Sequence, residues 1–255
     1  MPNEVPRNGT SSSPAPIHEH HPAPSGAATR YPRWPFHPLV VLLRRLVHFV
    51  VFFPFLRWLN PLYVHGRENI EGLTGPFIFV ANHASHADTP ALMRAMPAKI
   101  RRRMTAAAAA DYFFTSWIRG YVACFICNAF PFPRKGREGI ERAVWLLNHG
   151  WHIMLFPEGT RSLDGKIKPF KPGVGKLAAE SGATVIPVAL LGTTRVFPKG
   201  APLPRRASVE VRIGPAMCFT ADEDPVEITR QIEDTVRELA SPHGIDLVRG
   251  QVRKR

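Results

Sequence analysis

Three short and almost wholly apolar runs constrain the fold of this chain more than any other feature of its sequence. FIFVA, WHIMLFP and TVIPVALLG begin at residues 77, 151 and 184, and segments with helical spacing separate them. Strands that helices cover on both faces are apolar along their whole length, because neither face meets water. We therefore predict an α/β fold with a mostly parallel sheet flanked by helices.

The remaining elements are predicted from periodicity and turn residues. Apolar spacing predicts helices over residues 89–96 and 174–181. We expect the alanine-rich run 106–120 to be helical and the apolar run 121–130 to be a buried strand. Residues 208–214 alternate with a period of two, as an edge or half-buried strand does.

The chain length of 255 residues suits one α/β domain with appendages. Residues 1–33 are rich in Pro, Ser, Ala and His and lack apolar periodicity, which is typical of a disordered tail. We expect a membrane-interfacial helical segment over residues 34–60, the α/β domain over 61–240, and a basic C-terminal tail over 241–255.

The interfacial segment is the most apolar part of the chain. Its residues from Leu39 to Leu56 favour membrane insertion by roughly 4 to 8 kcal/mol, and Arg44 with Arg45 costs roughly 5 to 7 kcal/mol. This balance predicts a helix lying in the membrane interface, with Arg44, Arg45 and His48 on one face toward the headgroups. A helix packed on its own domain and a true span are the alternatives, and Pro54 is expected to end the helix.

The net charge limits the classes of partner that the chain can bind, and the cysteine content indicates its cellular compartment. Lysine and arginine outnumber aspartate and glutamate by 33 to 20, for a formal charge of +13, which favours an anionic partner. Lipid headgroups, an acidic carrier protein, a phosphorylated substrate and nucleic acid all qualify, but no basic patch with interleaved aromatics supports nucleic acid. Three cysteines are too few for a disulfide framework. We expect Cys124 and Cys127 to be buried reduced thiols, in a cytoplasmic setting.

The first candidate site is the heptapeptide NHASHAD, residues 82–88, between a predicted strand and a predicted helix. His83 can take a proton from a hydroxyl if a carboxylate holds its other ring nitrogen, and Asp88 can supply that carboxylate while capping the helix. Two alternatives stay open: a purely structural pair, and a metal site made by His83, His86 and Asp88.

The second candidate site is FPEGTRS, residues 156–162, after the second apolar run. Backbone N–H groups beside Gly159, followed by the guanidinium of Arg161, suit a phosphate group. If the loops converge, further cations complete an anion pocket: Arg134, Lys135, Lys168 and Lys171. An ordinary surface turn is the alternative.

The order of these motifs resembles that of the glycerophospholipid acyltransferase family. Its N-H-x-x-x-x-D block matches Asn82, His83 and Asp88, and its F-P-E-G-T-R-S block matches residues 156–162 without a gap. The apolar strand with a central proline matches residues 185–188. At 132–134, Phe-Pro-Arg departs from the family's usual glycine and aliphatic pattern. The resemblance covers residues 62 to 215.

The resemblance implies transfer of a fatty acyl group from acyl-CoA or acyl-carrier protein to a hydroxyl of a phosphate-bearing glycerolipid. Lysophosphatidate is the leading acceptor, and glycerol-3-phosphate or another lysolipid is the alternative. His83 would be the general base and Asp88 its orienter. The implied substrate-binding residues are Glu158, Gly159, Thr160, Arg161, Arg134 and Lys171.

The resemblance also implies no metal and no cofactor besides the acyl donor, and a place on the cytoplasmic face of a membrane. Readings of other classes are a metal-dependent phosphoesterase that uses His83, His86 and Asp88, and a membrane-binding protein without catalysis.

Overall fold

One seven-stranded sheet forms the centre of the computed structural model, which describes residues 34–113, 117–133, 136–162, 165–198, 200–201 and 203–250. The strands are β1 (Leu62–His65), β2 (Phe77–Ala81), β3 (Met104–Ala109), β4 (Phe130–Phe132), β5 (His152–Leu155), β6 (Thr184–Leu191) and β7 (Val209–Ile213). Their order across the sheet is β1-β7-β6-β2-β5-β3-β4. Every neighbouring pair is parallel except β6 and β7. The predicted mostly parallel α/β fold is confirmed.

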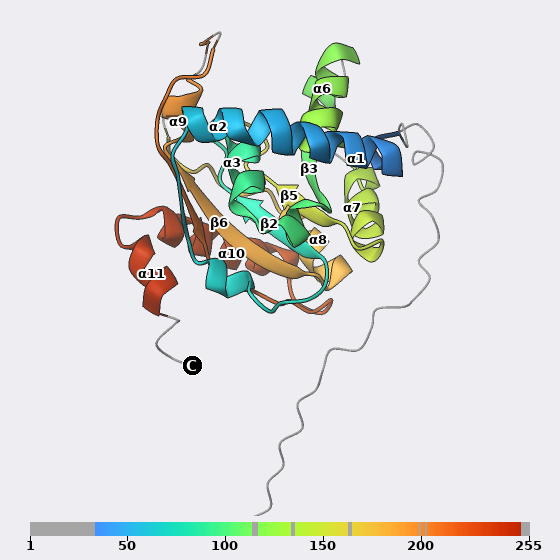
Figure 1. Cartoon of the computed structure of the whole chain (residues 1–255). Helices are drawn as coiled ribbons and strands as arrows, with labels where there is room; N and C mark the ends of the chain where they lie inside the picture. Colours follow the sequence, from blue (N-terminus) through green and yellow to red (C-terminus); the bar gives the residue numbers. More distant parts are fainter. Residues whose placement is uncertain are drawn as a thin grey trace, which may run out of the picture.

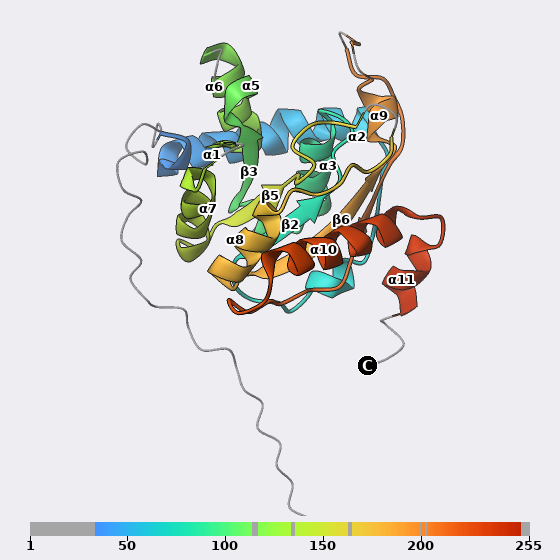
Figure 2. The ribbon, with the colours of Figure 1, turned by 180° about the vertical axis from the view of Figure 1, so that it is seen from behind.

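Helices cover both faces of this sheet (Figures 1 and 2). The helices of the domain up to residue 240 are α3 (Asp88–Ala95), α4 (Ala98–Arg101), α5 (Ala110–Phe113), α6 (Trp117–Cys127), α7 (Glu138–Asn148), α8 (Gly173–Ser181), α9 (Thr193–Val196) and α10 (Pro225–Ala240), with a 3-10 turn η4 (Arg67–Ile70). Alternate residues of β2 enter two separate cores: Phe77 and Phe79 pack with α3, whereas Ile78 and Val80 pack with α7, α8 and α10. This two-sided burial explains why the run FIFVA is apolar at every position.

Parts of two predicted elements have the opposite type in the structure. Of the helix predicted over residues 106–120, residues 106–109 belong to β3, whereas residues 110–113 and 117–120 are helical as predicted. Pairing of β3 with β5 on one side and β4 on the other outweighs the helix preference of alanine. The apolar run after it forms α6, in which Ala123 and Cys124 are buried while Tyr121 and Val122 are exposed. A run that is apolar throughout does not distinguish a strand from a helix by periodicity.

Residues 208–214 were expected at an edge or half buried, and the edge assignment is wrong. β7 lies between β1 and β6, and the edge strands are β1 and β4. The predicted C-terminal tail also needs correction, because α11 (Gly244–Gly250) forms within it. Val248 of α11 is buried against Leu239 and Ala189, which adds apolar contact beyond residue 240. The predicted tail over residues 1–33 lies outside the described residues.

The N-terminal apolar segment is one continuous helix, Pro38–Leu59, which crosses the upper side of the domain in Figure 1. It follows a 3-10 turn, η2 (Trp34–Phe36), and consists of α1 (Pro38–Val47), a π-helical turn η3 (His48–Phe52) and α2 (Phe53–Leu59). Pro54 does not end it. A proline cannot donate a backbone hydrogen bond, and the wider π turn directly before it accommodates that loss.

The polar side of this helix faces the protein, contrary to the predicted orientation. An Nη of Arg44 donates to the carbonyl of Pro35 at 2.6 Å, and Nε2 of His48 donates to the carbonyl of Ile126 at 2.8 Å. Both side chains are buried, so only Arg45 of the three predicted headgroup ligands is exposed.

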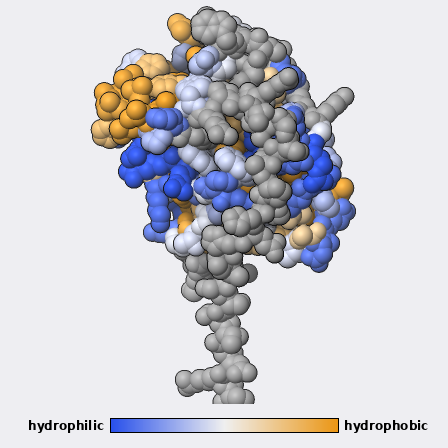
Figure 3. Space-filling view, turned by 90° about the vertical axis from the view of Figure 1, so that its right-hand side faces the viewer, coloured by the Kyte–Doolittle hydropathy of each residue, from blue (hydrophilic) through white to orange (hydrophobic). Residues whose placement is uncertain are grey.

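The opposite side of the helix presents an apolar face to the surroundings. Each of its large side chains is between 49% and 80% exposed: Leu39, Leu42, Leu43, Leu46, Phe49, Val50, Val51, Phe55 and Trp58. Figure 3 shows hydrophobic surface gathered at the upper side of the molecule, with hydrophilic surface beneath it. By length and composition the helix could cross a membrane. Its packing on the domain is that of a helix lying along a surface.

Burial of His152 makes stability depend on pH. Burial lowers the pKa of this histidine from its ordinary 6.5 to about 4, and its Nδ1 accepts the N–H of Phe77. Between these two pH values the unfolded chain binds more protons than the folded chain, so stability falls as pH drops from 6.5 to 4. We expect His152 to contribute about 3 kcal/mol of this loss, measured by urea unfolding at a series of pH values.

The variant His152→Asn keeps an acceptor for the N–H of Phe77 but does not titrate. At neutral pH its free energy of unfolding should be lower than that of the wild type, because the ring contact with Phe77 is lost. Between pH 6.5 and 4 this free energy should change less than that of the wild type. The exposed His243 supplies the matched control, since His243→Asn should keep the wild-type slope. Equal slopes for wild type and His152→Asn would contradict the assignment.

Candidate active site

Both motif loops leave the sheet at the same edge. β2 and β5 are parallel neighbours, so their carboxyl ends lie side by side, and residues 82–88 and 156–162 follow directly. Ligand sites of open α/β sheets form at this kind of position. The sheet therefore brings together two segments that are far apart in the sequence.

Asn82 fixes the start of the first loop. Its Nδ2 donates to the carbonyl of Leu190 at 3.0 Å, and its Oδ1 accepts the N–H of Leu190 at 2.7 Å. The two hydrogen bonds of this buried side chain take the place of backbone hydrogen bonds at the point where the pairing of β2 with β6 ends. The sequence analysis assigned no role to Asn82. Its position in the N-H-x-x-x-x-D block was the only indication that it matters to the site.

His83 and Asp88 form the predicted pair. Nδ1 of His83 lies 2.8 Å from Oδ2 of Asp88, which is fully buried. Since the carboxylate accepts, Nδ1 carries the hydrogen and Nε2 keeps its lone pair, as a general base requires. The ring of Phe156 stacks on the imidazole at 4.4 Å between centroids, and the His83 side chain stays 21% exposed.

Asp88 does not cap the helix as expected. It is the first residue of α3, and its Oδ2 accepts the N–H groups of Ala84 at 2.7 Å and Ser85 at 2.8 Å. These donors belong to the loop that precedes the helix. The carboxylate thus folds that loop around itself and holds the imidazole with the same oxygen.

Glu158 clamps the second loop to the first. It is buried, and its Oε1 accepts the N–H of His83 at 2.7 Å while its Oε2 accepts the N–H of Lys168 at 3.0 Å. Burial raises the pKa of the Glu158 carboxyl, and these two donors oppose that rise. The N–H of Ser162 donates to the carbonyl of His83 at 2.8 Å. Each oxygen of Glu158 accepts one backbone N–H, a geometry that fits a positioning residue, and its predicted contact with the substrate stays a prediction.

The rim of the site carries the predicted cations. Arg161 is partly exposed, and its guanidinium has no hydrogen-bond partner among the described residues. Lys168 is engaged, because its Nζ donates to Thr160 Oγ1 at 3.2 Å and to the carbonyl of Arg161 at 2.8 Å.

Lys171 lies directly over Gly159. A Cβ on Gly159 would come within 2.7 Å of Lys171 Nζ, and the backbone at this glycine has φ +70°. The positive φ favours glycine here, and a side chain at this position would push the flexible end of Lys171 aside. The predicted ligand Arg134 and its neighbour Lys135 lie outside the described residues.

A family model described as Acyltransferase matches residues 61–191, which is just over half of the chain. The chain belongs to the acyltransferase family. This membership confirms the resemblance predicted from the motifs.

Curated relatives of this acyltransferase are 28% to 40% identical to it over the aligned segments. It is 29% identical over 181 residues to a chloroplastic 1-acyl-sn-glycerol-3-phosphate acyltransferase of Brassica napus, a match covering 64% of this chain and 49% of the relative. It is 33% identical over 136 residues to a 1-acyl-sn-glycerol-3-phosphate acyltransferase of Chlamydomonas reinhardtii, covering 53% and 40%. The chain spans about half the length of the curated relatives it matches.

A solved structure is similar in fold. The crystal structure of a 1-acyl-sn-glycerophosphate (LPA) acyltransferase from Thermotoga maritima superposes with a TM-score of 0.60 at 24% identity. The match covers 88% of this chain and 99% of that one.

The acyltransferase site offers no group of three metal ligands. Among the described residues, no three His, Cys, Asp or Glu side chains are arranged to hold a metal ion. His86, the third ligand of the metal alternative, meets the ring of Phe197 edge to face at 6.1 Å instead. This arrangement gives the phosphoesterase reading no support.

Gly159 and Gly165 form a matched pair for testing the contact with Lys171. Both have positive φ, but a Cβ on Gly165 meets no described atom within 4 Å. We expect Gly165→Ala and Gly159→Ala each to lose about 1 kcal/mol of stability through backbone strain, because the methyl at position 159 moves only the flexible end of Lys171. Chemical unfolding measures both. The double variant Gly159→Ala, Lys171→Ala should unfold with the same free energy as Gly159→Ala, and a marked recovery of stability in the double variant would contradict a cheap displacement of Lys171.

Proposed function

We propose that this acyltransferase moves a fatty acyl group from a thioester donor to a free hydroxyl of lysophosphatidate, giving phosphatidate. One observation carries the proposal: a histidine held by a buried carboxylate, with a free Nε2, is clamped by backbone bonds to a loop that suits phosphate. The names of the relatives from Brassica napus and Chlamydomonas reinhardtii support this acceptor. Acyl-CoA and acyl-carrier protein are the candidate donors.

The geometry suits direct transfer. Nε2 of His83 takes the hydroxyl proton as the hydroxyl oxygen attacks the thioester carbonyl. The C–S bond then breaks, and the leaving thiolate receives the proton from the imidazolium. No acyl-enzyme is required, because a thioester is already activated. Asp88 stabilises the imidazolium that forms, and Asn82 and Glu158 hold the loop that carries it.

Three groups suit the phosphate of the acceptor. Arg161 offers a guanidinium without a partner among the described residues, Lys171 is exposed above Gly159, and the loop turns at that glycine. Thr160 is exposed on the same turn. We assign the predicted phosphate contacts to Arg161, Lys171 and the N–H groups beside Gly159.

The exposed apolar face of Pro38–Leu59 supports a membrane location for the enzyme, where its lipid substrates reside. Because Arg44 and His48 turn inward, this face is apolar over most of its length. We propose that the helix lies in one leaflet without crossing it, on the cytoplasmic side.

An acceptor panel tests the proposed reaction. The purified chain, with vesicles and labelled acyl-CoA or acyl-carrier protein, receives lysophosphatidate, glycerol-3-phosphate, other lysolipids and monoacylglycerol in separate reactions, and mass spectrometry identifies the product. We expect phosphatidate from lysophosphatidate and much less product from monoacylglycerol, which lacks the phosphate. Equal rates with these two acceptors would overturn the phosphate assignment.

Two substitutions separate proton transfer by His83 from the negative charge that Asp88 supplies. His83→Ala should lower kcat by about 10² to 10⁴, the usual contribution of a general base. Asp88→Asn can keep an oxygen toward the N–H groups of Ala84 and Ser85 and place its NH₂ at Oδ1, which is buried without a hydrogen bond among the described residues. The loop and the tautomer of His83 then persist, and only the charge opposite the imidazolium is lost.

We therefore expect Asp88→Asn to fold and to lower kcat about 10²-fold with little change in acceptor KM. Steady-state kinetics and unfolding midpoints check both variants. A His83→Ala variant that is folded and retains near-normal kcat would sink the assignment of the base.

A pair of valines tests membrane contact. Val50 on the apolar face and Val226 at the start of α10 are 59% and 61% exposed. We expect Val50→Asp to weaken binding to phospholipid vesicles about tenfold, because a buried valine contributes roughly 1.5 to 3 kcal/mol. Val226→Asp should bind as wild type does. Vesicle flotation measures both, and equal binding by the two variants would argue against this face.

A further inference from the structure

A cluster of cationic side chains borders the apolar face of the N-terminal helix. It consists of Arg57, Arg67, Arg101 and Arg102, and we call it the basic belt. Arg57 lies on the helix itself, Arg101 and Arg102 lie at the end of α4, and Arg67 lies in the turn η4. Hydrophilic surface lies directly beneath the hydrophobic surface of this side in Figure 3. The proposed reaction does not use these four side chains.

A cation–π contact holds the belt against the helix. The guanidinium carbon of Arg101 lies 4.8 Å from the centre of the Phe53 ring, and an Nη of Arg101 donates to the carbonyl of Met96 at 3.0 Å. Phe53 and Arg57 are four residues apart in α2, so they lie on the same side of the helix, one turn from each other. Arg57, Arg101 and Arg102 therefore gather beside α2, next to its apolar face.

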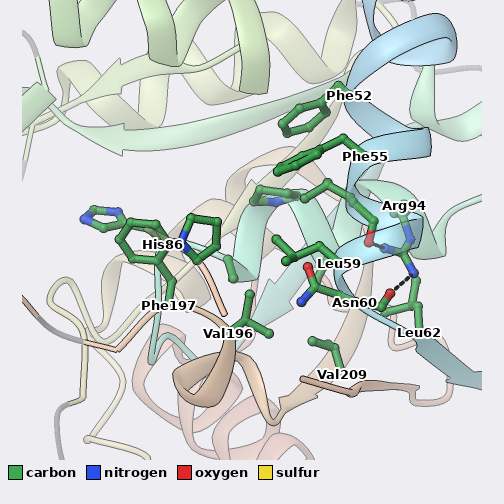
Figure 4. A pocket seen from close by; sticks show the side chains of 15 residues that line it. Phe52, Phe55, Leu59, Asn60, Leu62, His86, Arg94, Val196, Phe197 and Val209 are labelled. Atoms are coloured by element: carbon green, nitrogen blue, oxygen red, sulfur yellow. Dashed lines mark hydrogen bonds between the residues drawn. The ribbon is translucent and has the colours of Figure 1, made fainter. Parts of the chain in front are cut away.

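A fifth arginine at this end of the helix is already engaged within the fold. Arg94 of α3 donates to the carbonyls of Leu56 at 2.8 Å and Asn60 at 2.7 Å, which ties α3 to the end of α2 (Figure 4). It also lines an apolar pocket between α2 and α9, together with Phe55 and His86. The hydrogen-bonding capacity of Arg94 is thus used inside the molecule.

The belt, by contrast, has no counter-charge within the part of the chain that the structure describes. None of its arginines forms an ion pair with a described carboxylate, although Glu68 and Glu71 follow Arg67 in the sequence. All but Arg101 are exposed. Burial lowers the pKa of Arg101, and the charges of Arg102 and Arg67 lower it further. Cations gathered in this way repel one another, so an anion that reaches them stabilises the arrangement.

The belt lies away from the phosphate site proposed for the acceptor. Met104 and His152, the first residues of β3 and β5, are paired in a parallel register, so α4 lies at the amino ends of these strands. The two motif loops follow the carboxyl ends of β2 and β5, at the opposite edge of the sheet. An anion that the belt binds is therefore a different one from the phosphate beside Gly159.

The apolar face beside the belt identifies the source of that anion. In a lipid leaflet, anionic headgroups lie directly next to hydrocarbon, so a single surface meets an apolar face and a row of cations together. A soluble acidic protein would offer the charge without the hydrocarbon. The combination of nine exposed apolar side chains with unpaired arginines at their border favours the leaflet.

We propose that the basic belt binds the anionic headgroups of the leaflet that the apolar face of Pro38–Leu59 contacts. The inference rests on the membrane location proposed above and names the lipid class that this location requires. The apolar face binds any leaflet, and each exposed arginine near an anionic surface adds about fivefold in affinity. The cytoplasmic leaflet is rich in anionic lipid, so the belt directs the enzyme to that side.

Vesicle flotation of the full-length chain tests the belt without requiring turnover. One set of vesicles is phosphatidylcholine alone, and the other is a mixture of phosphatidylcholine and phosphatidylglycerol. We expect the double variant Arg57→Gln, Arg102→Gln to bind the anionic vesicles about thirtyfold more weakly than wild type and the neutral vesicles equally well. Salt screens exposed charges, so high ionic strength should remove the difference between wild type and variant.

Two controls separate a specific belt from a general effect of charge. Lys176 is exposed on α8, which packs into the core on the other face of the sheet, and Lys176→Gln should bind both kinds of vesicle as wild type does. The double variant Arg57→Lys, Arg102→Lys keeps both charges and should keep most of the preference for anionic vesicles. Unfolding midpoints establish that each variant is folded.

The outcomes distinguish the belt from the membrane location itself. A folded Arg57→Gln, Arg102→Gln variant that binds anionic vesicles as tightly as wild type overturns the proposal, and so does an equal loss in Lys176→Gln. Unchanged flotation combined with lost binding to acyl-carrier protein in vesicle-free solution would assign the belt to that protein instead. If Val50→Asp floats with neutral vesicles as wild type does, the membrane location fails, whatever the belt binds.

Discussion

The backbone of His83 is the point on which the site depends. Its N–H donates to Glu158 at 2.7 Å and its carbonyl accepts from Ser162 at 2.8 Å, so one residue is fastened to the second motif at two points. These bonds are possible only because β2 and β5 are parallel neighbours whose carboxyl ends coincide. The sheet therefore sets the distance between the candidate base and the candidate phosphate loop.

The buried and the exposed charged residues of this site have different roles. Asp88 and Glu158 are buried, and backbone N–H groups compensate each carboxylate. Such groups are costly to bury alone, and here they fold two loops into one rigid unit. Arg161 and Lys171 stay at the rim, where an anionic substrate can reach them. A fixed base beside open cations suits transfer to a hydroxyl that lies near a phosphate.

The N-terminal helix connects this pair of loops to an exposed apolar surface. Its hydrogen bonds to the domain come from polar groups, His48 on the helix and Arg94 from α3, and most of its large apolar side chains stay outside. This is the reverse of a helix packed on a soluble domain. The arrangement leaves an apolar surface beside an apolar pocket, and both lie near the loop that carries His83. Substrate entry from a lipid layer follows naturally from this geometry.

The sequence by itself determined the α/β class, the two motif loops, the His83 and Asp88 pair, and the apolar character of Pro38–Leu59. Those features are local: a run buried on both faces is apolar throughout, and a loop motif keeps its spacing. Only the tertiary structure decided that residues 106–109 form a strand, because the neighbouring strands β4 and β5 supply the pairing. It also turned Arg44 inward, occupied Glu158 with backbone donors, and set His86 against a pocket. Each of these depends on contacts between residues distant in the chain, which no local pattern encodes.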